Sequence, residues 1–280
     1  MQSKLFVTNI LTGAYKKLTA TFNNADKKAD LTWFKTKYLK HASPKREKIY
    51  RYKKNNIHYS HPIELLHTLR EIFIEEIYRI ELPPKALIID CGANIGLGII
   101  YLKEQYPDAH VIAFEPDENN FELLKKNIAS FKLQNVDARK EAVWIADSEL
   151  HFSNDGTMGS RIELSGTGDT RKVKAIKLAS LLNNKIHFLK IDIEGAEYTV
   201  IKDLKDSLSN VENVFLEYHG DFSQNNELTE IFNIMQGAGF SYYIKEAAEI
   251  YKNPFLAARR MKTTDFDVQL NLFFFRKEVQ

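Results

Sequence analysis

Apolar and polar positions follow two different rhythms, which change near Pro83-Pro84. Beyond these prolines, short apolar runs alternate with stretches that have helical spacing. The runs predict strands over 86–90, 110–116, 136–144, 187–192, 213–219, 241–247 and 268–277, and the stretches predict helices up to 106 and over 118–131, 196–208 and 228–240. This alternation is typical of an α/β fold with a mostly parallel, seven-stranded sheet covered on both faces. The last strand follows another without a helix between them, which indicates an antiparallel edge strand.

Residues 1–85 have a different pattern. Over residues 62–80 the apolar side chains recur at three- and four-residue spacing, which predicts an amphipathic helix. These apolar residues are Leu65, Leu66, Leu69, Ile72, Phe73 and Ile77. We therefore divide the chain into a mainly helical N-terminal region, 1–85, which could serve as a lid or recognise the acceptor, and a second domain, 86–280.

Charge is distributed unevenly between the two parts. Residues 1–60 contain 14 Lys or Arg and three acids, a balance of +11, which leaves −9 for the other 220 residues because the whole chain carries +2. A basic surface suits an anionic partner such as a phosphate-bearing substrate, a lipid headgroup on a membrane or a nucleic acid. The alternative is a solvated basic segment with no partner.

Composition excludes several classes of protein. With 44% hydrophobic and 27% charged residues, the chain resembles an average globular protein rather than a disordered one. No run approaches the roughly 18 apolar residues of a membrane span, and the first residues lack the apolar core of a signal peptide. The single cysteine, Cys91, excludes an internal disulfide and a thiolate metal cluster. We expect a cytoplasmic protein without a transmembrane segment.

A glycine-containing turn follows the first predicted strand of the second domain, at Asp90 to Gly98. A dinucleotide fingerprint starting at Gly92 would need glycine at the positions of Asn94 and Leu97, so a nicotinamide cofactor is disfavoured. No lysine motif of the phosphate-binding loop type is present either. The turn is therefore not of a type that holds a pyrophosphate.

The same turn fits a nucleoside that carries an amino-acid tail. Gly92 and Gly96 would allow the backbone to approach the ligand closely, and Asp90 can accept from an ammonium group. Glu115 ends the second strand of the domain, where a carboxylate can accept from both hydroxyls of a ribose. S-adenosylmethionine has an ammonium group and a ribose but no phosphate. The alternative is a purely structural turn with a capping acid.

Four segments resemble the FkbM family, within the class I S-adenosylmethionine-dependent methyltransferases. They read IIDCGANIG (88–96), FEPDENNFELLKKNI (114–128), FLKIDIEGAEYTVI (188–201) and VFLEYH (214–219). The resemblance implies a Rossmann-like class I methyltransferase fold, S-adenosyl-L-methionine as cofactor, and O-methylation of a sugar, glycoconjugate or natural product. It places the cofactor against Tyr78, Asp90, Gly92, Ala93, Asn94, Gly96, Glu115, Pro116, Asp117, Asn120, Glu141, Ala142, Val143 and Asp192.

Polar side chains at the ends of two later strands are the candidates for catalysis. Asp192 ends one predicted strand, and Glu217 and His219 lie on one face at the end of the next. His219 could act as a base oriented by Glu217, since a hydroxyl must lose its proton to become a good nucleophile. Alternatively, Asp192, Glu217 and His219 could hold a divalent cation, or they could form only structural ion pairs. Lys190 is expected to be a buried partner of Asp192 or Glu217.

The acceptor is expected to contact a polar, glycine-rich segment over 154–163 and the residue two positions beyond Asp192. The candidates are Thr157, Ser160, Arg161 and Glu194. The segment could equally be an ordinary hairpin turn.

Two other functions are alternatives to O-methylation of a sugar or related compound. Methylation of nucleic acid, for instance on ribose, would use the basic N-terminal region. However, the Asp192-Ile193-Glu194-Gly195 turn lacks the Pro-Pro-aromatic pattern of enzymes that methylate amino groups of bases. A non-catalytic binding protein with this fold is the other alternative, because fold alone does not fix function.

Overall fold

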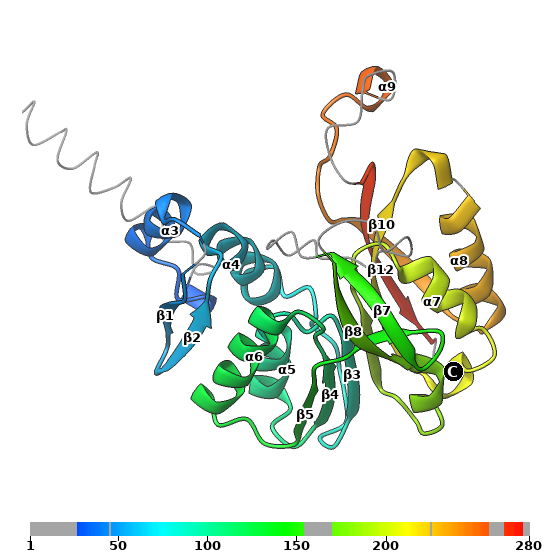
Figure 1. The fold of residues 1–280 in the computed structure, drawn as a ribbon, viewed down its shortest axis with the longest axis horizontal. Coiled ribbons are helices and arrows are strands. Elements are labelled where there is room, and N and C mark those ends of the chain that lie inside the picture. The colour runs from blue at the N-terminus through cyan, green and yellow to red at the C-terminus, as the bar shows by residue number, and fades with distance from the viewer. Residues whose placement is uncertain (1–26, 45, 154–169, 225, 258–265, 277–280) are drawn as a thin grey trace, which may run out of the picture.

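The computed structural model describes residues 27–44, 46–153, 170–224, 226–257 and 266–276. Its centre is a seven-stranded sheet with the order β11-β12-β10-β9-β3-β4-β5 (Figure 1). The strands span β3 (Leu87–Cys91), β4 (His110–Phe114), β5 (Val136–Arg139), β9 (Phe188–Ile191), β10 (Asn213–Gly220), β11 (Ser241–Glu246) and β12 (Val268–Phe275). The helices that alternate with them are α5 (Leu97–Gln105), α6 (Glu118–Ser130), α7 (Glu197–Asp203) and α8 (Asn226–Gly237). The predicted α/β fold with a mostly parallel sheet is confirmed.

The sequence predicted that the reversed strand would lie at the edge of the sheet, and this prediction is wrong. β12 pairs antiparallel with β10 on one side and with β11 on the other, so it lies one place in from the edge. The reason is its apolar face, since Leu272 and Phe274 are almost fully buried. β11 occupies the edge instead, where Tyr242 and Tyr243 are exposed.

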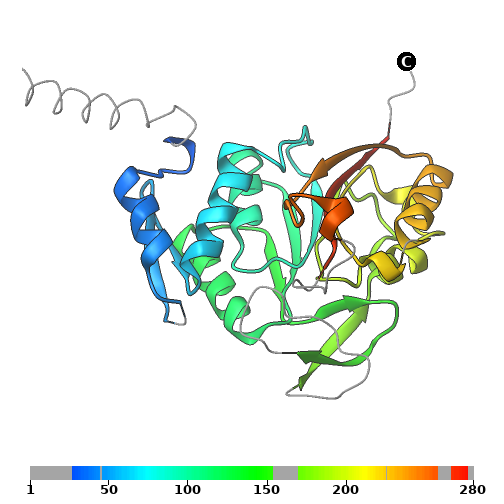
Figure 2. The same cartoon turned by 90° about the horizontal axis from the view of Figure 1, so that it is seen from above.

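The two faces of the sheet carry separate apolar cores. Successive residues of a strand point to opposite faces, and Ile88 packs on the side of α5 and α6 whereas Ile89 packs on the side of α7 and α8. Phe188 and Leu189 divide in the same way on β9. Helices therefore cover both faces, as the alternating pattern indicates (Figure 2).

The described part of the N-terminal region is less helical than predicted. It holds α3 (Trp33–His41), a hairpin of β1 (Lys48–Tyr52) and β2 (Asn55–Tyr59), and α4 (Pro62–Leu69), which continues as a π-helix over Arg70–Ile74. The helix predicted up to residue 80 ends near Glu75, because the backbone of Glu76 turns to a positive φ of 54°. No helix in the described ranges is long and apolar enough to span a bilayer.

The N-terminal region shares a core with the central sheet. Leu39 and Tyr52 belong to the same buried apolar cluster as Ile88 and Phe215. The side chain of Asn127 on α6 also accepts a hydrogen bond from the amide of His58 at 2.6 Å and donates one to its carbonyl at 3.0 Å. The side chain of Asn127 thus binds both backbone groups of one residue of β2, and it attaches the hairpin to α6.

The single strand predicted over 136–144 is two strands in different sheets. β5 borders the main sheet, whereas β6 (Ala142–Trp144) pairs with β8 (Thr170–Lys177) in a small sheet completed by β7 (Ser148–Ser153) (Figure 2). The small sheet buries apolar side chains of its own, among them Ala142, Leu150 and Val173. After Arg139 the chain leaves the main sheet, and Ala142 packs in the core of the small sheet.

Candidate functional site

Two adjoining cavities lie at the carboxyl ends of β3, β4, β9 and β10, where ligands of open α/β sheets bind. The larger has a volume of about 570 Å³ and the smaller about 80 Å³. Four predicted cofactor residues line both of them: Gly92, Asn94, Asn120 and Asp192. The two cavities together form one site with two compartments.

Nearly all of the predicted cofactor residues face this site. The larger cavity adds Tyr78, Asp90 and Ala93, and the smaller one adds Glu115, Pro116, Asp117, Glu141, Ala142 and Val143. Gly96 lines neither cavity. The lining is an observation, whereas contact of these residues with a cofactor stays a prediction.

The two glycines of the turn are required by other parts of the chain, not only by a ligand. A Cβ on Gly92 would lie 1.9 Å from the carbonyl oxygen of Asp192, and one on Gly96 would lie 2.6 Å from Cδ1 of Leu124. Both residues also have positive φ, 91° and 87°, which only glycine adopts readily. The expected close approach is therefore made by β9 and α6, which pack directly against the turn.

Glu115 is held in place by the backbone. Its Oε2 accepts from the amide of Asn94 and its Oε1 from the amide of Asp117, both at 2.8 Å. Burial raises the pKa of Glu115 to about 8, although these two hydrogen bonds act in the opposite direction. The carboxyl group is thus fixed at the end of β4 by backbone amides, and no cationic side chain of the described ranges forms an ion pair with it.

Asp90 pairs with a buried lysine on the next strand. Asp90 and Lys190 are opposite each other in the β3–β9 register, and Lys190 Nζ lies 3.3 Å from Asp90 and 3.2 Å from Asp192. It also donates to the carbonyl of Gly92 at 2.7 Å. The predicted pairing of Lys190 with Asp192 is confirmed, and Asp90 rather than Glu217 is its second partner.

Asp117 has structural tasks as well as a place in the lining. It caps the start of α6 by accepting from the amide of Asn120 at 2.9 Å, and its other oxygen pairs with Arg171 of β8. This ion pair joins the small sheet to α6. Glu115 and Asp117 each have one hydrogen-bond partner on both oxygens, but only Asp117 is paired with a cationic side chain.

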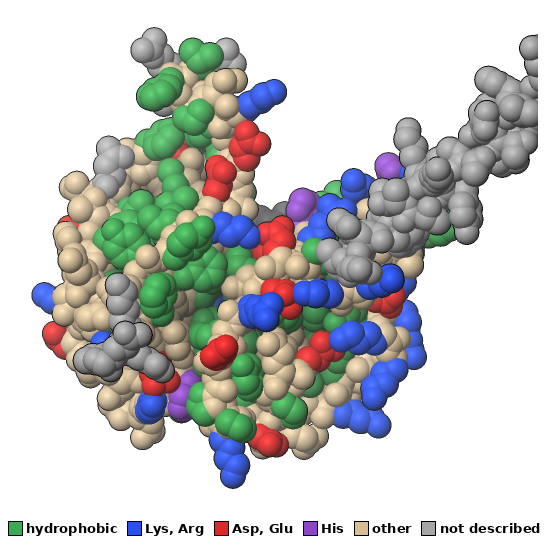
Figure 3. Space-filling model, turned by 180° about the vertical axis from the view of Figure 1, so that it is seen from behind, with side chains coloured by type: hydrophobic (Ala, Val, Ile, Leu, Met, Phe, Trp, Pro, Cys, Tyr) green, Lys and Arg blue, Asp and Glu red, His purple; other side chains and the backbone are tan. Residues whose placement is uncertain are grey.

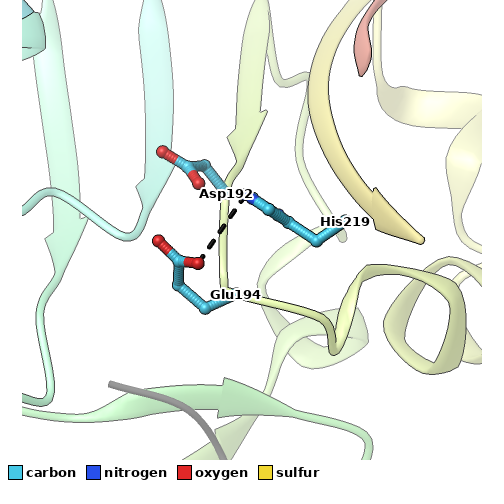
Figure 4. Close-up of side chains that lie close together, drawn as sticks. All are labelled: Asp192, Glu194 and His219. Carbon is cyan, nitrogen blue, oxygen red and sulfur yellow. Dashed lines mark ion pairs between the residues drawn. The ribbon is translucent and has the colours of Figure 1, made fainter. Parts of the chain in front are cut away.

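The predicted catalytic residues Asp192, Glu217 and His219 come together at the ends of β9 and β10. Figure 4 shows two of them, Asp192 and His219, beside Glu194. Ligand atoms of Asp192, Glu194 and His219 all lie within 4.8 Å of one another. Glu194 and Glu217 each place one carboxylate oxygen 3.7 Å from Nε2 of His219. Burial, together with the charge of Asp192, raises the pKa of Glu194 and of Glu217.

Glu197, rather than Glu217, orients His219. Its buried Oε1 lies 3.2 Å from Nδ1 of His219 and also accepts from the amides of Ile193 and Gly195. Burial alone would lower the pKa of His219, but the hydrogen bond to Glu197 and the nearby carboxylates raise it to about 10. Glu197 was not among the site residues predicted from the sequence, so this partner was missed.

The wall opposite this cluster comes from α4 and the π-helix, which the sequence analysis did not place in the site. The larger cavity is lined there by His61, Glu64, His67, Thr68 and Glu71. These polar residues recur at three- and four-residue spacing between the buried leucines of α4, a signal that could have revealed them. Asn271 of β12 donates to Glu71 at 3.2 Å, and burial raises the pKa of Glu71.

The remaining acceptor candidates divide into two groups. Glu194 faces both cavities. Thr157, Ser160 and Arg161 lie outside the described residues.

The sequence of this chain is similar to those of known proteins. Residues 90–242 match the family described as the methyltransferase FkbM domain. Methyltransferase 1 of Beauveria bassiana (strain ARSEF 2860) is 26% identical over 199 residues, which cover 60% of this chain and 79% of that protein. The 31-O-demethyl-FK506 methyltransferase FkbM of Streptomyces tacrolimicus is 24% identical over 238 residues, which cover 68% and 88%.

A solved structure of methyltransferase FkbM from Methylobacillus flagellatus KT is also similar. It aligns with a TM-score of 0.47 and 14% identity over 76% of this chain and 54% of its own. The family match covers more than half of the 280 residues and includes the whole lining of the smaller compartment. The chain therefore belongs to the FkbM methyltransferase family.

Proposed function

We propose that the protein is an S-adenosylmethionine-dependent O-methyltransferase whose acceptor is a hydroxyl of a sugar, glycoconjugate or related natural product. One observation carries the proposal: the small compartment, with Glu115, opens onto a larger one whose shared border holds Asp192 and Glu194. A nucleoside placed against Glu115 would direct its tail toward that border and the residues beyond it.

The described residues fit S-adenosylmethionine on several counts. Oδ1 of Asp90 is buried and accepts no well-directed hydrogen bond, so it can receive one from an ammonium group. Glu115 can accept from a ribose diol, and the apolar Ala142 and Val143 suit the face of an adenine. When bound, the cofactor supplies a sulfonium methyl: the acceptor oxygen gains this carbon, the electron pair of the broken bond stays on sulfur, and the hydroxyl proton leaves.

The larger compartment favours a neutral, hydroxyl-rich acceptor. Hydroxyl groups both donate and accept hydrogen bonds, and so match carboxyl groups, which accept when ionised and can also donate when protonated. Glu64, Glu71, Glu194 and Glu217 all face this space. An anionic group at the same place would be repelled. Negative charge on a carrier is better placed against the N-terminal side of the molecule, where Lys and Arg side chains gather (Figure 3).

Glu217 is the best placed group to take the hydroxyl proton. It faces the cavity, and burial and the charge of Asp192 raise its pKa, so its ionised form binds a proton more tightly than an ordinary carboxylate does. Asp192, Glu194 and His219 surround the same space and can orient the acceptor. The relative from Streptomyces tacrolimicus supports transfer to oxygen, because its name describes an O-demethyl compound as its acceptor.

A transfer assay tests this function. Methyl-labelled S-adenosylmethionine is incubated with the protein and an extract of its own cells, and lipid, glycan, protein, nucleic acid and small molecules are then separated. Label in glycan, glycolipid or a hydroxylated small molecule is the expected result. Label in nucleic acid would overturn the acceptor assignment, and failure to bind S-adenosylmethionine in a calorimetric titration would favour a non-catalytic binding protein.

A further inference from the structure

His219 is unusual among the polar residues of the site, because its two ring nitrogens have different surroundings. The side chain is 98% buried, and Nδ1 lies 3.2 Å from Glu197, whose carboxylate is itself fixed by backbone amides. Nε2 makes no hydrogen bond within the described ranges, and it points toward Asp192 and Glu194 (Figure 4). A carboxylate on Nδ1 is how proteins fix a histidine whose other nitrogen binds a metal.

The distances around Nε2 suit a shared ion better than direct contact. Oε2 of Glu194 and Oε1 of Glu217 are both 3.7 Å away, which is beyond hydrogen-bond range. Two ligands about 2.1 Å from one tetrahedral ion lie about 3.4 Å from each other. The ligand atoms of Asp192, Glu194 and His219 lie within 4.8 Å of one another. Small rotations of the two carboxylates would bring these atoms to the separation that one ion requires.

We propose that Asp192, Glu194 and His219 form a binding site for one divalent cation at the border of the two compartments. Two carboxylates and one imidazole are ligands that Mn²⁺, Fe²⁺ and Zn²⁺ accept. The surrounding charge favours a cation, because the ion pairs of the described residues set five acids, Asp90, Asp192, Glu194, Glu197 and Glu217, against two basic residues, Lys190 and His219. Lys190 already pairs with Asp90 and Asp192, so acids remain in excess around Nε2.

The site would be open on the side where an acceptor enters. Asp192 and Glu194 keep about a quarter of their side-chain surface exposed, at 25% and 23%, and both line the larger cavity. Three protein ligands leave at least one coordination position for an acceptor oxygen. A bound cation lowers the pKa of a coordinated hydroxyl, whose proton would pass to Glu217. This use rests on the proposed O-methyl transfer, whereas the binding of the ion does not.

The experiment uses Mn²⁺ as the probe on the full chain, after removal of metals with a chelator. Calorimetry measures the stoichiometry and affinity, and pulsed electron paramagnetic resonance detects the ¹⁴N coupling of a coordinated imidazole. We expect one Mn²⁺ per chain with a nitrogen signal. Glu194→Gln should weaken binding at least tenfold and keep the signal at saturation, whereas His219→Ala should weaken binding and remove the signal.

Glu64→Gln is the matched control, because Glu64 lines the same cavity from α4 but is not one of the three ligands; it should keep the affinity of the wild type. Glu194→Gln changes a partly exposed side chain, so it keeps the test decisive if His219→Ala fails to fold. The proposal is overturned if Mn²⁺ does not bind saturably, if no nitrogen coupling appears, or if Glu64→Gln weakens binding as much as Glu194→Gln. Titration with S-adenosylhomocysteine tests the proposed function separately, since a protein can bind it without the ion.

Discussion

The two compartments of the site are built in different ways. The small one is formed mainly by residues 90–143, and its central acid, Glu115, is held by two backbone amides. The large one combines α4, the π-helix and the ends of β9 and β10, and its groups are held mainly by other side chains. A backbone hydrogen bond survives most substitutions of the residue that donates it. The small compartment is therefore expected to tolerate sequence change, while the large one can change its chemistry through single residues.

The largest effect is expected in the large compartment. His219→Ala should lower turnover by about 10²- to 10⁴-fold, the usual contribution of a group that handles a proton or holds the reacting atoms, without weakening cofactor binding. Steady-state kinetics and a binding titration on the same preparation check this. Because the change leaves Glu197 buried without its partner, circular dichroism must show a folded variant. Unchanged turnover would remove His219 from the mechanism.

Gly92→Ala should affect folding at the junction of the two compartments. The new Cβ would meet the carbonyl of Asp192 at 1.9 Å, and φ is 91°, so we expect a loss of about 2–4 kcal/mol in the free energy of unfolding. Urea denaturation measures it. Gly237→Ala is the control, because its Cβ meets nothing within 4 Å; a similar loss in both variants would contradict the steric argument.

Glu115→Ala tests the small compartment. It should weaken S-adenosylmethionine binding by about 1–3 kcal/mol, because two hydrogen bonds to the ribose are lost. Calorimetry measures the affinity, with Glu118→Gln on the exposed start of α6 as control. An affinity equal to that of the wild type would show that Glu115 does not bind the ribose.

The smallest expected effect is a pH dependence of stability. The pKa of Glu115 is raised to about 8 in the folded protein, so between its ordinary value and pH 8 the folded state holds a proton that the unfolded state has released. The contribution of Glu115 to the free energy of unfolding is therefore present at low pH, and it is lost as the pH rises toward 8. Between pH 6 and 7 the wild type should lose about 1 kcal/mol more than Glu115→Gln. Parallel pH profiles of the two proteins would contradict this.

The sequence predicted the small compartment better than the large one for a physical reason. Its residues follow directly after β3 and β4, so their positions depend on local strand–turn–helix geometry. His61, Glu64 and Glu71 reach the large compartment only because α4 packs across the sheet, and helical periodicity shows which face is apolar but not what the polar face meets. Glu197 was missed because the fold of the turn at Gly195, and not the spacing, brings it to His219.

The strand predictions failed where tertiary pairing overrode local order. The run over 136–144 is continuous in sequence, but its first half pairs in the seven-stranded sheet and its second half in the three-stranded sheet. β12 was expected at the edge because it follows another strand without a helix between them, yet it pairs with β10 on one side and β11 on the other. In both cases the apolar run was identified correctly, but the strands with which it pairs were not.

The attachment of the hairpin to α6 limits how this enzyme can be recombined with its relatives. The family match begins at residue 90, but Asn127 ties β2 to α6 and also donates to the carbonyl of Ile95 in the glycine turn. A chimera joined at residue 86 would exchange the α4 wall together with the hairpin, and so would separate Asn127 from the His58 backbone groups of its own parent. Grafting a new acceptor preference should therefore keep Asn127 and the hairpin from the same parent, even where only α4 is meant to change.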